Sequence, residues 1–246
     1  MTRRRWIADE VHGKTAALTG EHAAHLSRVL RAQVGQEFDI ATGDAVRRGT
    51  ITSVSDERVE FALGEELAVK PSAKLTLVLA IFKFDRMEWA IEKCTEIGVA
   101  RIIPVVARRT DAHLASAAAK RHERWLRIAR QAAEQSRRAA PPEILAPVKL
   151  KELGGAGILP ASAVEIVMRA PRIVLAESET NTALRDVLPA SGSEAVLAVG
   201  PEGGWSDDEW RWFSESGWTS ASLGETILRA ETAAIVATAL ALDALR

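Results

Sequence analysis

The sequence predicts an α/β protein in which a mostly parallel sheet follows a small N-terminal β-barrel. Two patterns lead to this prediction. Up to residue 68, short strand-like runs are separated by turn residues such as Gly35 and Gly43. From residue 73 onward, continuous apolar runs alternate with helical patterns, as in parallel sheets covered by helices on both faces. The 246 residues, 47% of them hydrophobic, are enough for one large domain or two smaller ones.

The barrel is predicted from alternating apolar residues and turn signals. Its strands are expected over four ranges: residues 5–8, 37–41, 46–54 and 58–63. One helix is expected over residues 21–31, and strands this short around a single helix favour a compact barrel. The polar segment 64–74, which contains Pro71, is expected to be a linker. The predicted domains therefore span residues 1–68 and 73–246.

The second domain is predicted from continuous apolar runs that mark buried strands. These runs are residues 75–82, 99–106, 173–176 and 195–199. Asp85 should cap a helix that ends at Gly98, and residues 122–138 should form a long helix stopped by two prolines. Ser206 and Glu209 form a capping box, and residues 228–232 open the last helix. Residues 154–160 are expected to form a surface loop with no assigned role.

Composition narrows the possible functions. The net charge of −1 means that any nucleic-acid site must be a local basic patch. The single cysteine, Cys94, excludes an internal disulfide, fits a reducing cytoplasm and lies on the apolar stripe of its predicted helix. No apolar run reaches the roughly 18 residues that a membrane span needs. Apart from His22 and His25, no histidines or cysteines have metal-ligand spacing, so no metal site is expected.

The most informative stretch runs from residue 195 to residue 239. Its first apolar run ends in the turn GPEGG, where Gly200, Gly203 and Gly204 would let the backbone approach a ligand closely. A second glycine-marked strand end, at Gly224, precedes Arg229 and Glu231. Because open α/β sheets bind ligands at the carboxyl ends of their strands, the two turns predict a shared pocket.

The chemistry of this predicted pocket is limited by what the sequence lacks. The phosphate-binding P-loop, the dinucleotide fingerprint G-x-G-x-x-G and the hydrolase elbow G-x-S-x-G are absent. A backbone-lined pocket with few charges suits a flat heterocycle and a zwitterion better than a polyphosphate. The residues alone also allow a plain strand-to-helix connection, with Arg229 and Glu231 forming a surface ion pair.

The pair GPEGGWSDDEW and LGETILRAETA resembles the C-terminal motifs of the SPOUT methyltransferases. More narrowly, it resembles the bacterial small-subunit ribosomal RNA uracil-N3 methyltransferase family. Blocks at residues 3–6, 25–31, 83–99 and 124–138 resemble the same family in the same order, so the likeness covers nearly the whole chain. Trp205 stands where this resemblance leads us to expect phenylalanine.

The resemblance implies a fold, a cofactor and an assembly. The fold would be a SPOUT-type parallel sheet with a C-terminal trefoil knot, joined to a PUA-like RNA-binding β-barrel. The cofactor would be S-adenosylmethionine, and the assembly a homodimer in which the partner chain completes each active site. The residues expected to bind the cofactor are Leu175, Glu177, Gly200, Pro201, Glu202, Gly203, Gly204, Leu223, Gly224, Ile227, Leu228, Thr232 and Ala233.

The implied reaction is methyl transfer to N3 of a uridine in 16S ribosomal RNA of the small subunit. Because N3 carries an imide proton on the pairing edge, the base must be unpaired and deprotonated. Arg229 is expected to stabilise the uracil anion or to bind phosphate, and Glu202 or Glu231 to accept the proton or steer the cofactor's amino group.

RNA contacts are expected from grouped basic residues and a neighbouring tryptophan that would stack on a base. These residues are Arg3, Arg4, Arg5, Trp6, His25, Arg28, Arg31, Arg137 and Arg138. Two alternatives stay open: a SPOUT methyltransferase acting on another RNA or another atom, and a non-catalytic RNA-binding factor for ribosome assembly.

Overall fold

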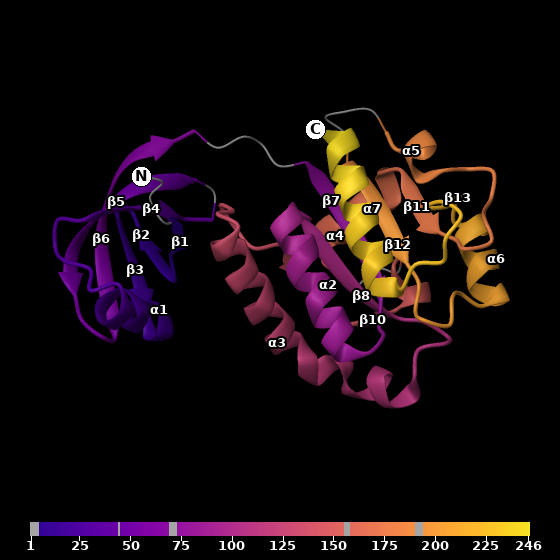
Figure 1. Ribbon diagram of the computed structural model, residues 1–246, viewed down its shortest axis with the longest axis horizontal. Helices are drawn as coiled ribbons and strands as arrows, with labels where there is room; N and C mark the ends of the chain where they lie inside the picture. Colours follow the sequence, from indigo (N-terminus) through magenta and orange to yellow (C-terminus); the bar gives the residue numbers. More distant parts are fainter. Residues whose placement is uncertain (1–4, 44, 69–72, 155–157, 190–193) are drawn as a thin grey trace. The chain divides into compact units, whose positions relative to one another are not determined.

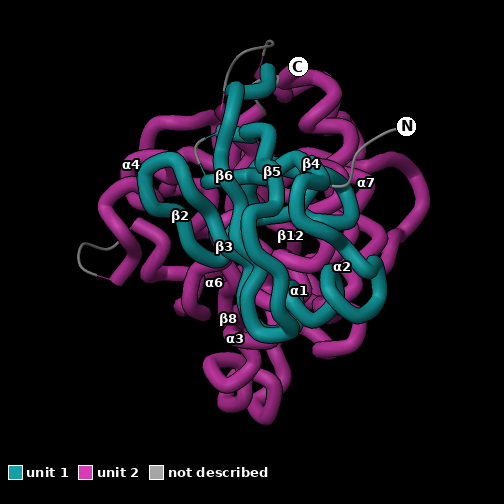
Figure 2. The backbone as a smooth tube through the Cα atoms, turned by 90° about the vertical axis from the view of Figure 1, so that its left-hand side faces the viewer, with its two compact units in different colours: residues 1–71, 133–141 teal, residues 72–132, 142–246 magenta. Residues whose placement is uncertain are grey.

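The chain folds into two compact units, each with its own sheet and hydrophobic core. A computed structural model describes residues 5–43, 45–68, 73–154, 158–189 and 194–246 (Figure 1). Unit 1 comprises residues 1–71 and 133–141, and unit 2 comprises residues 72–132 and 142–246 (Figure 2).

Unit 1 is built on a six-stranded sheet in the order β1-β4-β5-β6-β3-β2. Its strands are β1 (Arg5–Ile7), β2 (Glu10–His12), β3 (Thr15–Thr19), β4 (Glu37–Ala41), β5 (Val46–Val54) and β6 (Arg58–Leu67). The pair β1–β4 is parallel and the other neighbours are antiparallel. Leu18, Ile40 and Phe61 are fully buried in one cluster, so unit 1 has a hydrophobic core of its own.

The predicted helix over residues 21–31 is two shorter helical pieces. The α-helix α1 (Gly20–Ala24) continues into the π-helical turn η1 (His25–Val29). Leu26 from this segment is fully buried in the core of unit 1. Arg31 follows with a positive φ of 50°, which turns the chain away from the helical path.

Unit 2 contains a parallel sheet in the order β10-β8-β7-β12-β11-β13, with β9 paired beside β8. Its strands are β7 (Lys74–Ala80), β8 (Arg101–Val106), β9 (Glu143–Ile144), β10 (Val148–Lys149), β11 (Arg172–Leu175), β12 (Glu194–Val199) and β13 (Thr219–Ala221). Because every pairing is parallel, all carboxyl ends lie at one edge of the sheet.

Helices cover both faces of the sheet in unit 2. They are α2 (Phe84–Ile97), α3 (Ala112–Gln135), η2 (Leu150–Glu152), α4 (Ala161–Arg169), α5 (Leu184–Val187), α6 (Asp207–Glu215) and α7 (Ala230–Leu245). Leu77 and Leu79 of β7 face one core with α2, α3 and α7, whereas Val78 and Ala80 face another with α4 and α6. Successive strand residues point to opposite faces, so the continuous apolar runs correctly predicted a sheet buried on both sides.

The structure corrects several predicted boundaries. Lys83 rather than Asp85 is the N-cap of α2, and Asp85 lies in the first turn. The long helix α3 begins at residue 112, not at residue 122. Residues 64–67 belong to β6 instead of a linker, because Glu66 pairs with Arg47 across the neighbouring strand. Residues 69–72 and 155–157, from the predicted linker and loop, lie outside the described residues.

Cys94 is fully buried on α2, as its place on the apolar stripe predicted, and its sulfur accepts a hydrogen bond from Thr238 of α7. Burial raises the pKa of the Cys94 thiol to about 12. None of the helices in the described parts of the chain is long and apolar enough to cross a membrane.

Candidate functional site

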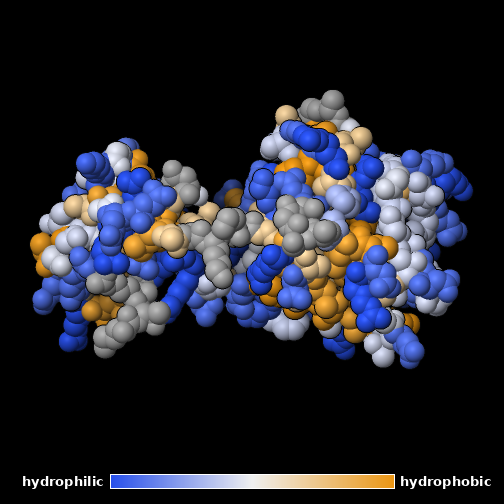
Figure 3. Space-filling model, turned by 90° about the horizontal axis from the view of Figure 1, so that it is seen from above, coloured by the Kyte–Doolittle hydropathy of each residue, from blue (hydrophilic) through white to orange (hydrophobic). Residues whose placement is uncertain are grey.

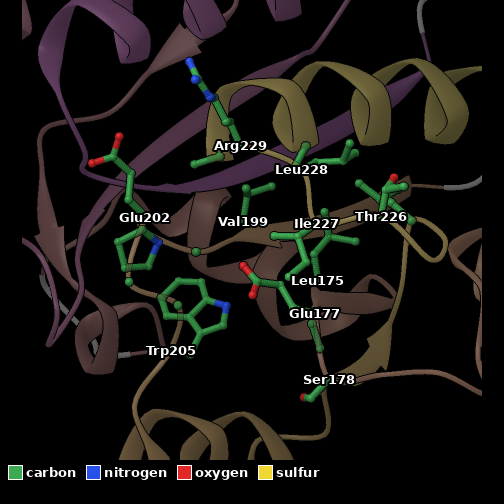
Figure 4. A pocket seen from close by; sticks show the side chains of 18 of the residues that line it. Leu175, Glu177, Ser178, Val199, Glu202, Trp205, Thr226, Ile227, Leu228 and Arg229 are labelled. Carbon is green, nitrogen blue, oxygen red and sulfur yellow. The ribbon is translucent and has the colours of Figure 1, made fainter.

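A cavity of about 520 Å³ opens at the carboxyl edge of the sheet in unit 2. The segments that follow β11, β12 and β13 supply most of its wall (Figure 4). The two glycine-marked strand ends are not direct neighbours, because β11 lies between β12 and β13. The segment from Leu175, the last residue of β11, to Ser178 therefore lines the cavity between the two turns.

The GPEGG turn brings bare backbone to the cavity wall. A Cβ atom on Gly200 would lie 3.2 Å from the Trp205 indole, so the ring packs directly against the main chain at this position. Gly204 has a φ of 70°, and its amide donates to the Pro201 carbonyl at 2.8 Å to close the turn. Glycine is favoured at position 204 because this left-handed conformation is strained for other residues.

Two side chains attach this turn to the segment that follows β8. Glu209, 4% exposed, accepts hydrogen bonds from the Ser206 amide at 2.8 Å and from the Arg108 amide at 2.7 Å. Arg109 donates from Nη1 to the Gly203 carbonyl at 2.8 Å. The predicted capping box of Ser206 and Glu209 is thus present, and its carboxylate also fixes a segment that lies about a hundred residues earlier in the chain.

Charged side chains gather at the rim of the cavity. Arg86 of α2 forms an ion pair of 2.6 Å with Glu202 and lies 3.8 Å from Glu231. Arg229, the N-cap residue of α7, is exposed and has no ion pair or side-chain hydrogen bond within the described chain. In Figure 4 the Glu177 carboxylate points toward the space between Trp205 and Val199, whereas Arg229 and Glu202 project from the rim.

The structure brings the predicted cofactor residues together with one exception. All of them line the cavity except Thr232, which lies in the first turn of α7. Of the three predicted catalytic residues, Glu202 and Arg229 line the cavity, and Glu231 lies buried behind the wall at 4% exposure. Arg86 and Arg109 were missed as pocket residues, because no local pattern indicates that side chains from α2 and from the segment after β8 reach this edge.

The predicted RNA-binding residues of unit 1 have mixed positions. Arg3 and Arg4 lie outside the described residues. Trp6 is a correction: it is 8% exposed and lies in the core, so its ring leaves little face on which a base could stack. His25 is exposed at a ring distance of 5.7 Å from Trp6, and Arg28 forms an ion pair of 2.8 Å with Asp56.

Four further predicted RNA-binding arginines also belong to unit 1. Arg5 donates to the backbone carbonyl of Arg137, and Arg137 is exposed with a φ of 58°. Arg138 is partly buried, which lowers its pKa to about 10, so its guanidinium stays charged at neutral pH. Arg31 is exposed on the surface of the unit.

His22 is a basic group of unit 1 whose pKa is strongly raised by its neighbours. Its ring contacts Asp9 at 3.3 Å and Glu134 at 3.4 Å, and its edge faces Trp6. The hydrogen bond to Asp9, followed by that to Glu134, raises the pKa of His22 to about 9. We call Trp6, His22 and His25 the Trp6 cluster. Among the described residues, no group of three or more His, Cys, Asp or Glu side chains could hold a metal ion.

Comparisons with known proteins identify relatives along the whole chain. Residues 69–242 match the RNA methyltransferase domain family. The ribosomal RNA small subunit methyltransferase E of Synechocystis is 31% identical over 236 residues, which cover 94% of this chain and 74% of the relative. The protein of the same name from Rickettsia conorii is 32% identical over 236 residues, with 93% and 89% covered.

Solved structures of similar proteins share the fold. The ribosomal RNA small subunit methyltransferase E of Neisseria gonorrhoeae, bound to S-adenosyl methionine, matches with a TM-score of 0.80 at 27% identity, covering 97% of this chain and 96% of that chain. A Legionella pneumophila protein in complex with the bound cofactor SAM matches with a TM-score of 0.81 at 30% identity, covering 99% and 98%. The chain therefore belongs to the RNA methyltransferase family that contains the ribosomal RNA small subunit methyltransferases E, a SPOUT-class family.

Proposed function

We propose that this chain uses S-adenosylmethionine to methylate N3 of a uridine in 16S ribosomal RNA of the small subunit. The observation that carries the proposal is the cavity at the carboxyl edge of the parallel sheet, lined by the GPEGG turn and the residue 223–233 segment. Its position matches the ligand site expected for open α/β sheets. The bound cofactor in the structures of two similar proteins supports the choice of ligand.

The residues around the cavity fit this cofactor. Gly200 and Gly203 keep the wall free of side chains, and the Trp205 indole nitrogen is buried without a hydrogen-bond partner in the described chain. Leu175, Leu223 and Ile227 offer apolar surface for the adenine ring. Glu177 and Glu202 offer carboxylates for the ammonium group of its amino acid end.

Bound S-adenosylmethionine supplies a methyl group on a positively charged sulfur, and the protein has to position the acceptor in line with it. The target nitrogen must lose a proton, so a cation near the base lowers the cost of the anion. Arg229 fits this role because its exposed guanidinium has no ion-pair partner among the described residues. Of the two predicted catalytic carboxylates, Glu202 is better placed than Glu231 to contact the cofactor or the base directly, because Glu202 lines the cavity and Glu231 does not.

RNA would be held partly by unit 1, which we propose to be a PUA-like barrel. The described basic residues of the predicted set remain its candidate RNA contacts, since each is at least partly exposed: Arg5, His25, Arg28, Arg31, Arg137 and Arg138. A target base splayed out of its helix would then reach the cavity of a methyltransferase subunit. The proposed reaction takes place in the cytoplasm, on the RNA or on an assembling subunit.

We further propose a C-terminal trefoil knot and a homodimer. A region of hydrophobic surface is visible on unit 2 in Figure 3. Trp89 of α2 is 48% exposed and Leu240 of the neighbouring α7 is 44% exposed, which supports a self-association surface along these helices. A folded monomer in sedimentation experiments at micromolar concentration would contradict the dimer.

Small subunits that lack the modification, treated with the protein and labelled S-adenosylmethionine, test the proposed reaction. Mass spectrometry is expected to find one methylated uridine, and primer extension to stop at that nucleotide because the pairing edge is blocked. A label on another atom or another RNA would support a different SPOUT activity. If calorimetry detects no cofactor binding while the protein still binds RNA, the result would instead support a non-catalytic ribosome-assembly factor.

A further inference from the structure

Arg86 joins the two segments that form the cavity. It lies in the first turn of α2, and its side chain is 30% exposed. On one side its Nη1 lies 2.6 Å from the carboxylate of Glu202, in the GPEGG turn. On the other side its Nε lies 3.8 Å from Glu231, at the start of α7. One guanidinium thus faces a carboxylate from each of the two C-terminal motifs.

Glu231 needs such a cation more than Glu202 does. The Glu231 residue is 4% exposed, and its Oε2 is buried without a hydrogen-bond partner in the described parts of the chain. A buried carboxylate without compensation is costly, because it has lost its hydration. The Arg86 guanidinium is the cation that the structure places beside it, at 3.8 Å.

The GPEGG turn has few other side-chain anchors. Arg109 holds the Gly203 carbonyl, and Glu209 holds the segment after the turn. Glu202 is the acidic residue of the five-residue GPEGG turn. Its side chain is held by Arg86. A glycine-rich turn released from this contact would sample more conformations, and ordering it would oppose ligand binding.

We propose that Arg86 is a positioning residue for the cofactor: it fixes the GPEGG turn through Glu202 and the start of α7 through Glu231. The proposal rests on the proposed function, since it assumes that the cavity binds S-adenosylmethionine. Arg86 lies on α2, which belongs to neither C-terminal motif. Through Arg86, α2 would hold the two walls of the cavity at the separation that cofactor binding requires.

Calorimetry with S-adenosylmethionine on Arg86→Gln tests this role. We expect a dissociation constant raised about tenfold, the usual loss for a hydrogen bond to a charged group. The matched control is Arg124→Gln: Arg124 also pairs with a carboxylate, Glu88 of α2 at 2.8 Å, but does not line the cavity. We expect the control to bind within about twofold of the wild type.

Two further variants separate positioning from general stability. Arg86→Lys keeps the cation and should recover most of the affinity lost in Arg86→Gln. Because Arg86 acts through Glu202, the double variant Arg86→Gln with Glu202→Gln should lose clearly less than the sum of the two single losses. The Michaelis constant for the cofactor should rise more than turnover falls.

The outcomes are distinguishable. Wild-type affinity in Arg86→Gln, or full additivity in the double variant, would overturn the positioning role while leaving the proposed function intact. Lowered affinity that Arg86→Lys does not restore, accompanied by a lower melting temperature, would reduce Arg86 to a structural residue. A wild-type protein that does not bind the cofactor would instead overturn the proposed function.

Discussion

The cavity of unit 2 and the Trp6 cluster of unit 1 are assembled in opposite ways. The cavity wall consists largely of consecutive residues in turns, and its side chains at the rim, such as Arg229, are exposed. The Trp6 cluster is made of side chains from separate elements, with the His22 ring held between two carboxylates. Exposed side chains at the cavity rim can therefore be replaced without unfolding the protein. The side chains of the Trp6 cluster, in contrast, contribute to the stability of unit 1.

Arg229→Ala should show the largest effect and tests the first half of this comparison. We expect turnover to fall about 100-fold, as when one donor to a developing anion is removed, with little change in cofactor affinity. The melting temperature should not change, because this side chain is exposed and makes no ion pair within the described chain. Single-turnover kinetics and calorimetry measure the two quantities, and a wild-type rate would remove Arg229 from the catalytic residues.

Gly203→Val is the complementary variant at the same site. A Cβ on Gly203 would lie 3.5 Å from the Arg109 side chain, an ordinary contact, so the variant should fold. Its branched side chain would occupy the wall that the cofactor approaches, so we expect cofactor binding to be lost in calorimetry. Unchanged binding would mean that the backbone at this turn does not contact the ligand.

Glu209→Ala should reduce the stability of the protein, although Glu209 lies beside the cavity. It is therefore an exception to the contrast between the cavity and the Trp6 cluster. Its removal leaves the amides of Ser206 and Arg108 without the acceptor that the buried Glu209 carboxylate supplies, which should cost about 2 kcal/mol of the free energy of unfolding. The control is the neighbouring Asp208→Ala, whose side chain is 75% exposed and should change stability by less than about 0.5 kcal/mol. Denaturant unfolding measures both, and equal stabilities would show that the capping box is dispensable.

His22→Asn should have the smallest effect and tests the second half of the comparison. The folded-state pKa of His22 is about 9, above its ordinary 6.5, mainly because of Asp9 and then Glu134. Its stabilisation is therefore complete below pH 6.5 and is lost as the pH rises through about 9. Allowing for solvent screening, we expect about 1 kcal/mol.

The pH dependence distinguishes this effect from loss of packing. Wild type should lose stability between pH 7 and pH 10 more steeply than His22→Asn, and nuclear magnetic resonance should follow the imidazole directly. Cofactor binding should be the same in both proteins, because the Trp6 cluster does not line the cavity. An imidazole that titrates near its ordinary pKa would contradict the pairing with Asp9 and Glu134.

The sequence predicted those features that depend on contiguous residues. Continuous apolar runs predicted the buried strands β7, β8 and β12, and glycine spacing predicted the turns that line the cavity. The contribution of Arg86 and Arg109 could not be predicted, because it depends on which helix and which strand end lie beside the turn. The burial of Trp6 was missed for the same reason: a basic, aromatic segment can place its ring on the surface or in a core.

Short elements with weak patterns were also missed. Strand β2 has three residues, two of them exposed, so it carries no apolar alternation that could be recognised. The first ten residues of α3 are rich in alanine, and the helical period there depends on Leu114 and Ala118 alone. In β2 the neighbouring strand rather than local preference determines the structure. The alanines at the start of α3 favour a helix by themselves, so what was missing there was a clear apolar period.

The left-handed backbone at Arg137 has a consequence for how this surface can change. Just past the end of a helix, this conformation favours glycine or asparagine, and an arginine there costs about 1 kcal/mol. The Arg137 side chain is exposed and has no partner within the described chain that would offset this cost. Arg137→Gly would relieve the backbone strain and at the same time remove a positive charge. A variant selected only for heat resistance could therefore bind a polyanion less tightly.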